Sequence, residues 1–293
     1  MSSPVELIRA LAALSEPPAP EHDRIRALLD LPPQPTPAEH TELFSHQVYP
    51  YASVYLGGEG MLGGDARGRV AGFWTAVGVD PPEDADHLAG LLSLWASLRA
   101  RSDAEMDEAR ARLGEQASEA LVFEHLAPWV LVFVEAIRGL QTAAGNADGF
   151  YASWANTLER VFLEFTTAQD GLPVHLANAP VLPDPGEEGG EAFLSGLLAP
   201  VRSGFVLTRS DLRRLTRDLE LGGRIAERKY ALRAYLSQDP GGVLEWLAVE
   251  ADAWTARHRN PCPDVERFWV ERAERAAATI RRAAAQAREW VTA

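Results

Sequence analysis

Apolar residues recur at the three- and four-residue spacing of helices that bury one face, and this pattern dominates the first 170 residues. Its clearest example is the run Val70, Phe73, Trp74 and Val77. A turn with two prolines follows, and then a second apolar face begins, made of Leu88, Leu91, Leu92, Trp95 and Leu98. Gly78 stands between the two faces and predicts a left-handed cap that ends the first helix.

Helix start signals support the same interpretation of the chain. Capping boxes occur at Ser3–Glu6, Thr36–Glu39 and Ser102–Glu105, and the last predicts a helix to about Phe123. Pro128 is expected to open a strongly apolar helix, and Asp239-Pro240 another. No convincing strand alternation appears before residue 170, so we predict an all-α fold, a multi-helix bundle.

Composition divides the chain into three parts. Residues 1–170 form the predicted helical bundle, and residues 171–190 are rich in proline, glycine and acid, as expected of a linker. Residues 191–293 are expected to form a helical C-terminal extension. Its segment 202–235 carries nine basic and four acidic residues, a local charge of +5.

The remaining bulk properties exclude some function classes. The formal net charge is −14, which argues against binding nucleic acid over the whole surface and favours cationic partners. No apolar run reaches the roughly 20 residues that a membrane span needs, so we expect none. Met1–Ser15 lacks the features of a signal peptide, and the single cysteine, Cys262, fits a reducing compartment.

One set of residues between 45 and 165 resembles a known family. Tyr51-x-Ser53, Phe73-Trp74, Gly78 and then Asp86-His87-Leu88 after a proline turn are similar to the signature of the TorD/DmsD/NarJ family. Members of that family are cytoplasmic chaperones of molybdenum-cofactor oxidoreductases. They bind the twin-arginine signal peptide of the enzyme and hold back its export until the cofactor is inserted.

The resemblance implies a cytoplasmic, non-catalytic protein with no cofactor of its own. Its partner would be the catalytic subunit of a molybdopterin-dependent oxidoreductase, including the signal peptide. The implied peptide-binding residues are Tyr51, Ser53, Phe73, Trp74, Glu83, Asp84, Asp86, His87, Leu88 and Trp95. A weaker match around His125 and Trp129 implies a surface where the partner docks.

General chemistry supports the peptide site but leaves a structural alternative open. Carboxylates in one turn can accept the fork of a guanidinium, and tryptophan rings can contact an apolar peptide. However, an aspartate at a helix start also caps the helix, and an aromatic residue on a helical stripe is more often part of the core.

Two further functions are weaker alternatives. Gly58-x-Gly60-x-x-Gly63 matches the dinucleotide fingerprint and could indicate a nucleotide-dependent enzyme, but only Ser53–Leu56 could supply the preceding strand. The segment 202–235 could be a helix-turn-helix of a DNA-binding regulator, with helices at 210–219 and 224–235. Its arginines could instead pair with acids of the same chain, and we regard nucleic acid as an unlikely partner.

Metal-dependent and nucleophilic catalysis have little support. No histidine follows a glutamate at the Glu-x-x-His spacing, and Asp84-x-x-His87 is a single substitute, so we expect no metal site. The Gly-x-Ser-x-Gly elbow of hydrolases is absent, and Cys262 lies between two prolines like an ordinary loop cysteine. We therefore predict no catalytic residue.

Overall fold

The structure is a computed structural model that describes residues 4–223 and 227–292. That part of the chain is helical and contains no strand. The first elements are α1 (Pro4–Ala13), α2 (His22–Leu28), α3 (Pro37–Thr41), η1 (Glu42–Gln47), α4 (Ala52–Leu56), α5 (Gly64–Ala76), α6 (Leu88–Ala104), α7 (Glu108–Leu121), η2 (Val122–Leu126), α8 (Val130–Ala143) and α9 (Phe150–Phe165). The later ones are α10 (Val174–Ala177), α11 (Gly190–Leu197), α12 (Pro200–Ser203), α13 (Arg209–Asp218), α14 (Arg228–Gln238), α15 (Pro240–Thr255) and α16 (Pro263–Thr292). The all-α prediction is confirmed.

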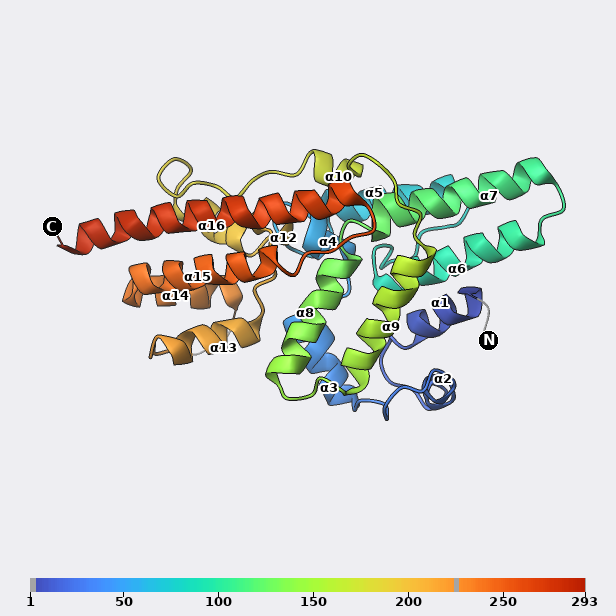
Figure 1. The fold of residues 1–293 in the computed structure, drawn as a ribbon, viewed down its shortest axis with the longest axis horizontal. Coiled ribbons are helices and arrows are strands. Elements are labelled where there is room, and N and C mark those ends of the chain that lie inside the picture. Colours follow the sequence, from blue (N-terminus) through green and yellow to red (C-terminus); the bar gives the residue numbers. More distant parts are fainter. Residues whose placement is uncertain (1–3, 224–226, 293) are drawn as a thin grey trace.

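The N-terminal half is a helical bundle around an aromatic core. Figure 1 shows α8 and α9 side by side in the middle of the molecule, with the α6–α7 hairpin at one tip. The ring of Phe133 packs against Tyr55, Trp129 and Trp154. Trp154 also donates its Nε1–H to the carbonyl of Leu11 over 3.1 Å, which ties α9 to α1. The tryptophan ring therefore buries its apolar face in the bundle while its N–H still has a hydrogen-bond partner.

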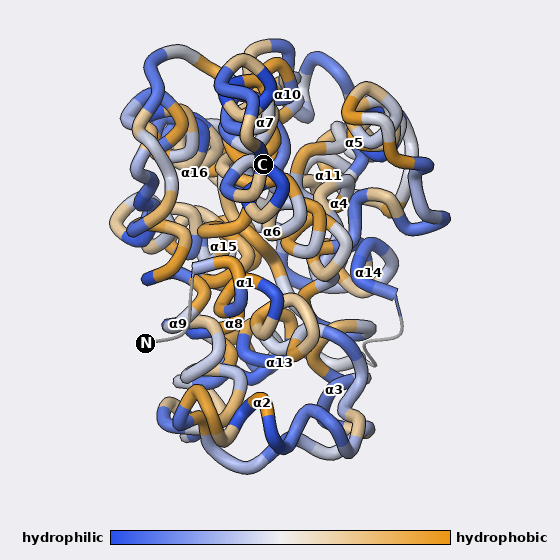
Figure 2. Tube along the Cα trace, turned by 90° about the vertical axis from the view of Figure 1, so that its right-hand side faces the viewer, coloured by the Kyte–Doolittle hydropathy of each residue, from blue (hydrophilic) through white to orange (hydrophobic). Residues whose placement is uncertain are grey.

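The C-terminal half is built on the long helix α16, which packs along α15 and extends toward the opposite tip (Figure 1). Trp269 of α16 donates its Nε1–H to the carbonyl of Pro128 over 2.8 Å. Buried residues from both halves join in one hydrophobic core. In Figure 2 many apolar stretches of the chain gather toward the middle of the molecule, and polar stretches predominate at its edges. The extension is therefore packed onto the bundle.

Several predicted helix ends are confirmed. Thr36 and Glu39 form both bonds of a capping box at the start of α3. Asp239 accepts the N–H of Gly242 and caps α15, whose first residue is Pro240. Gly78, just after α5, has φ +75°, as predicted for a left-handed cap. Ser3 of the first expected capping box lies outside the described residues.

Other predicted boundaries were wrong. Ser102 opens no helix, because α6 continues to Ala104 and the Ser102 hydroxyl donates to the carbonyl of Ala111 over 2.8 Å. The next helix starts at Glu108, where the Asp107 side chain accepts the N–H of Arg110. The apolar helix begins at Val130, two residues after Pro128.

No single described helix is long and apolar enough to cross a membrane. Two consecutive helical segments, Glu108–Leu126 and Val130–Ala143, have together the length and apolar composition of a membrane span, but they are bent by 50° relative to each other.

Candidate functional site

The candidate peptide site is organised by a short contact between two distant segments, 50–53 and 86–88. Ala52 donates its N–H to the carbonyl of Asp86 over 3.0 Å, and Leu88 donates to the carbonyl of Pro50 over 2.8 Å. Tyr51 and His87 face each other in this isolated antiparallel bridge. The bridge holds the turn that precedes α6 against the start of α4.

Asp86 caps a helix, but not the helix that follows it in the sequence. Its side chain is 1% exposed and accepts the N–H of Ser53, in the first turn of α4, over 2.9 Å. The hydroxyl of the buried Ser53 accepts the N–H of Gly63 over 3.0 Å. A carboxylate at this place satisfies a backbone donor and complements the positive end of the helix.

His87 is itself the N-cap of α6. Its Nδ1 accepts the N–H of Ala89 over 3.2 Å, so the neutral ring carries its proton on Nε2. Burial lowers the pKa of His87, and the nearby carboxylates of Glu16, Asp84 and Asp86 oppose that shift. Leu88, the first residue of α6, is fully buried. The Asp-His pair therefore starts two helices at once.

The aromatic residues of the predicted site differ in accessibility. Trp74 is buried and donates its Nε1–H to the carbonyl of Ala85 over 2.9 Å, and Trp95 is 1% exposed. Phe73 is half-buried, and its ring lies 5.0 Å from that of His125. In this conformation Trp74 and Trp95 contact the core of the chain, whereas Phe73 and Tyr51 reach the surface.

Glu16, Tyr51, Glu83, Asp84 and His87 form a surface that we call the acidic bend. The three acids are exposed. The Tyr51 hydroxyl donates to Asp84 Oδ2 over 3.4 Å, and its ring packs edge-on against His87 at 4.8 Å. Glu16 Oε1 lies 3.7 Å from His87 Nδ1. Clustered carboxylates beside an aromatic ring can accept guanidinium or ammonium groups.

Sequence reasoning missed Glu16. It follows α1 in a loop, about 70 positions before His87, and no local pattern links the two. The bend also binds a cation of its own chain, since the Arg67 guanidinium donates to the carbonyl of Glu83. Burial raises the pKa of Tyr51, and the Asp84 carboxylate raises it further, so the phenol stays a hydrogen-bond donor at neutral pH.

The second predicted segment is internal. Trp129 is fully buried, donates to the carbonyl of His125 over 2.8 Å and stacks on Tyr55. His125 is also buried, with its ring 5.5 Å from that of His175. Burial lowers the pKa of His125 to about 4, and the neighbouring His175 adds to the shift. Both predicted docking residues thus lie beneath the surface.

The structure offers little for a metal or a nucleophile. No cluster of three or more histidine, cysteine, aspartate or glutamate side chains suited to a metal occurs within residues 4–223 and 227–292. Cys262 is buried, and that burial raises the pKa of its thiol. The glycine-rich loop follows helix α4, so the strand that a dinucleotide fold requires before this loop is absent there.

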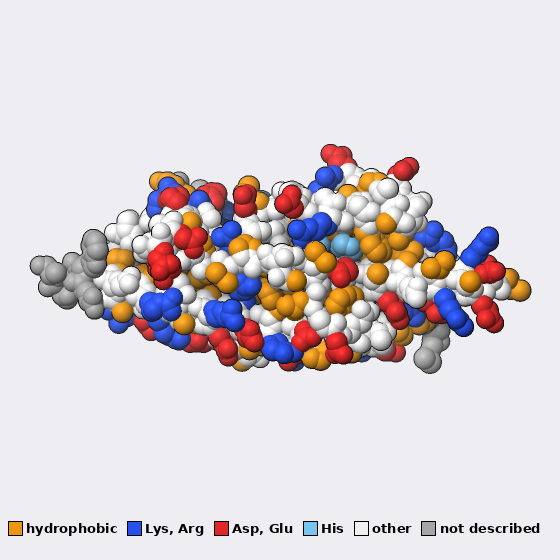
Figure 3. Space-filling model, turned by 90° about the horizontal axis from the view of Figure 1, so that it is seen from above, with side chains coloured by type: hydrophobic (Ala, Val, Ile, Leu, Met, Phe, Trp, Pro, Cys, Tyr) orange, Lys and Arg blue, Asp and Glu red, His pale blue; other side chains and the backbone are white. Residues whose placement is uncertain are grey.

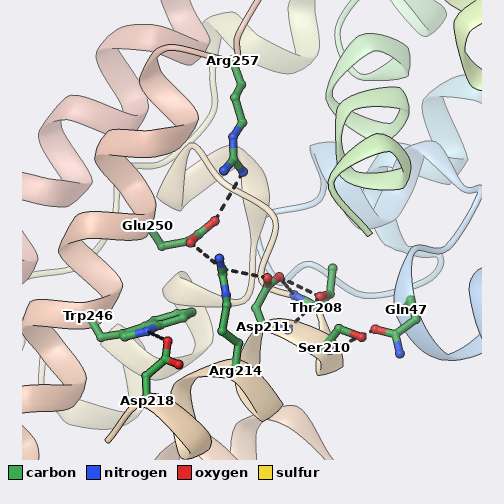
Figure 4. A network of polar contacts seen from close by, with 9 residues as sticks. All are labelled: Gln47, Thr208, Ser210, Asp211, Arg214, Asp218, Trp246, Glu250 and Arg257. Carbon is green, nitrogen blue, oxygen red and sulfur yellow. Dashed lines mark hydrogen bonds and ion pairs between the residues drawn. The ribbon is translucent and has the colours of Figure 1, made fainter. Parts of the chain in front are cut away.

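Arginines of the basic segment are largely engaged within the chain. Arg214 binds Asp211 and the buried Glu250, which also binds Arg257, and Figure 4 shows this network between α13 and α15. The Arg233 guanidinium lies 2.6 Å from a carboxylate oxygen of Glu191. Arg228 is half-buried and donates to the carbonyl of Leu207. Arg224, where the second helix was expected to begin, lies outside the described residues, and α14 starts at Arg228.

The contacts of this segment favour the pairing alternative over a helix presented to DNA. Ser210 donates its N–H to the side chain of Gln47 over 3.1 Å, so the same region is joined to the N-terminal bundle (Figure 4). Elsewhere, on the face that carries α10 and α16, acidic and basic side chains are interspersed (Figure 3). No continuous basic surface is visible on that face.

Comparison with known proteins gives a match, and it covers the residues of the acidic bend. No curated protein and no solved structure matches the chain. A family model does match, the one described as nitrate reductase delta subunit, over residues 14–135. These residues begin just after α1, end within α8 and include every predicted site residue. Over residues 14–135 the chain is therefore similar to the nitrate reductase delta subunit family, whose members are NarJ/TorD-type chaperones, and this match supports the resemblance seen in the sequence.

Proposed function

We propose that this protein is a cytoplasmic chaperone that binds the twin-arginine signal peptide of a molybdenum-cofactor oxidoreductase. It holds the apo catalytic subunit and assists cofactor insertion before export or assembly. The observation that carries the proposal is the acidic bend, where three exposed carboxylates surround a half-buried tyrosine and histidine within the family segment.

The proposal gives the site residues two different roles. Glu83, Asp84 and Glu16 are exposed and accept the two guanidinium groups, while Tyr51 and His87 present ring edges beside them. The apolar part of the peptide packs on half-buried apolar side chains of α5 and the residues that follow it, namely Phe73, Val77 and Val79.

The buried residues position this surface and do not contact the peptide. Asp86 and Ser53 fix the bend to α4, and Leu88 anchors the start of α6. Trp74 holds the carbonyl of Ala85, and Trp95 fills the core under α6. His125 and Trp129 support the docking region for the catalytic subunit from inside.

Calorimetry with a synthetic signal peptide tests the proposal. The peptide carries an Arg-Arg pair followed by an apolar run, and the variant is Glu83→Gln/Asp84→Asn. Exposed ion pairs contribute about 0.2–1 kcal/mol each, so losing two of them should weaken binding about two- to thirtyfold. Raising the salt concentration should weaken binding to the wild-type protein more than to the variant.

The matched control is Glu187→Gln/Glu188→Gln, which removes two exposed acids from the loop before α11. Both variants have the same net charge, so a general charge effect would lower affinity equally in the two. The proposal predicts a loss only in the acidic bend. Equal affinities of the wild type and the Glu83/Asp84 variant would overturn it.

A further inference from the structure

A second site candidate lies around the glycine-rich loop, away from the acidic bend. A cavity of about 530 Å³ is lined by residues 56–59 and 61–66, by Arg69 of α5, by His175 and by Arg202 of α12. The loop is held closed against the C-terminal half, because the backbone of Gly60 packs on Leu198 and Ala199. The volume is in the range of small-molecule sites.

The wall of this cavity includes the start of a 13-residue helix, α5. Its N-cap is Gly63, and no side chain caps this end. The first three residues of α5, Gly64, Asp65 and Ala66, line the cavity. The first N–H groups of a helix have no partner within it and carry a partial positive charge, which suits an anion.

Polar side chains without partners provide the second, independent observation. His175 is 4% exposed and lines the cavity, yet neither of its ring nitrogens has a hydrogen-bond partner. The Nε of Arg202 is buried and also lacks one. Neither Arg69 nor Arg202 forms an ion pair with the residues that the structure describes. Buried donors in native proteins normally have partners, so their absence here points to a ligand.

The balance of charge indicates the size of that ligand. Burial, with a smaller contribution from the charge of Arg69, lowers the pKa of His175 to about 4, so this ring is neutral and Arg69 and Arg202 are the cations of the cavity. The exposed carboxylates of Glu59 and Asp65 also line the cavity. They would repel a long polyanion such as nucleic acid, whereas a single small anion can reach Arg69, Arg202 and the helix start together.

We propose that this cavity binds a small oxyanion of the phosphate type, either free or as a monoester. Its oxygens accept hydrogen bonds from the first N–H groups of α5 and from Arg202, and Arg69 adds a longer-range attraction. A neutral His175 donates one further bond. The glycine-rich loop forms the wall of this site without a strand before it, so the arrangement differs from a dinucleotide fold.

Isothermal titration of the full chain with inorganic phosphate tests this site, with sodium chloride as the reference at equal ionic strength. One saturable site is expected. Arg202→Gln should weaken binding about tenfold, because it removes a charge-assisted hydrogen bond. Arg69→Gln should weaken it about threefold, since this side chain is exposed. Arg110→Gln, an exposed arginine of α7, is the matched control and should change nothing.

Glycerol phosphate, titrated in parallel, distinguishes the two sources of the anion. Tighter binding than inorganic phosphate assigns the site to a monoester, and weaker binding assigns it to the free ion. Circular dichroism confirms that each variant is folded. Absence of saturable binding of either compound, or an equal loss in Arg110→Gln, would overturn the proposal. Signal-peptide binding at the acidic bend is measured separately and does not depend on this result.

Discussion

Replacing Asp86 distinguishes a structural carboxylate from one that contacts a ligand. Asp86→Ala removes the acceptor of the Ser53 N–H, which lies in the first turn of α4 and is closed off from water. An unsatisfied buried donor costs about 1–3 kcal/mol, and loss of a helix cap about 1 kcal/mol. These two costs describe the same bond and are not added, so we expect a loss of about 1–3 kcal/mol in the free energy of unfolding.

Asp86→Asn is the informative partner variant, because its amide oxygen can still accept the same bond. Only the interaction of the negative charge with the helix start is lost, about 0.3–1 kcal/mol. Urea unfolding followed by circular dichroism measures both variants against the wild type, and an unchanged denaturant slope shows that the same surface is exposed.

Peptide binding by the Asp86 variants tests whether this carboxylate only supports the acidic bend or contacts the peptide itself. Because Asp86 is buried, Asp86→Asn should leave the affinity for the signal peptide within about twofold of wild type. The reasoning is refuted if Asp86→Ala unfolds at the wild-type urea concentration. It is equally refuted if Asp86→Asn abolishes peptide binding while its stability is unchanged, because the carboxylate would then act on the peptide directly.

Three further predictions concern stability. Burial lowers the pKa of His125, His175 and His258 to about 4, so the unfolded state binds more protons than the folded state between about pH 6.5 and pH 4. The free energy of unfolding should therefore fall in that window by up to about 1.4 kcal/mol per histidine for each pH unit of acidification. Urea titration at several pH values measures this fall, and a flat profile would contradict the burial of these histidines. Gly60→Ala should lower the thermal midpoint more than Gly63→Ala, because both glycines have positive φ but only at Gly60 would a Cβ lie 2.4 Å from the carbonyl oxygen of Leu198; equal shifts would contradict the close approach. Glu250→Ala should cost up to about 2 kcal/mol in urea unfolding, because it removes two ion pairs: Arg257 loses this partner, and Arg214 keeps only Asp211. A cost near zero would show that the network adds no stability.

Much of the helical architecture could be predicted from local pattern. Val70 and Trp74 are buried on one face of α5, as their spacing indicates, and Asp239 caps α15 as its position before Pro240 suggests. Such features depend on residues three or four positions apart, which the sequence displays directly.

The candidate site was less accessible to sequence reasoning, because it depends on contacts between distant segments. Asp86 resembles a cap for α6, yet the chain folds its carboxylate back onto α4. Glu16 reaches His87 only because the loop after α1 passes beside the start of α6. The Ser102 capping box fails for a similar reason, since its hydroxyl bonds the neighbouring helix α7 at Ala111.

Mapping the bound signal peptide tests the central claim most directly. A photo-reactive residue placed next to the Arg-Arg pair should form its adducts within residues 79–88 or at Tyr51, and Glu83→Gln/Asp84→Asn should reduce their yield. Adducts confined to the C-terminal half, with a yield that this double variant leaves unchanged, would contradict the account.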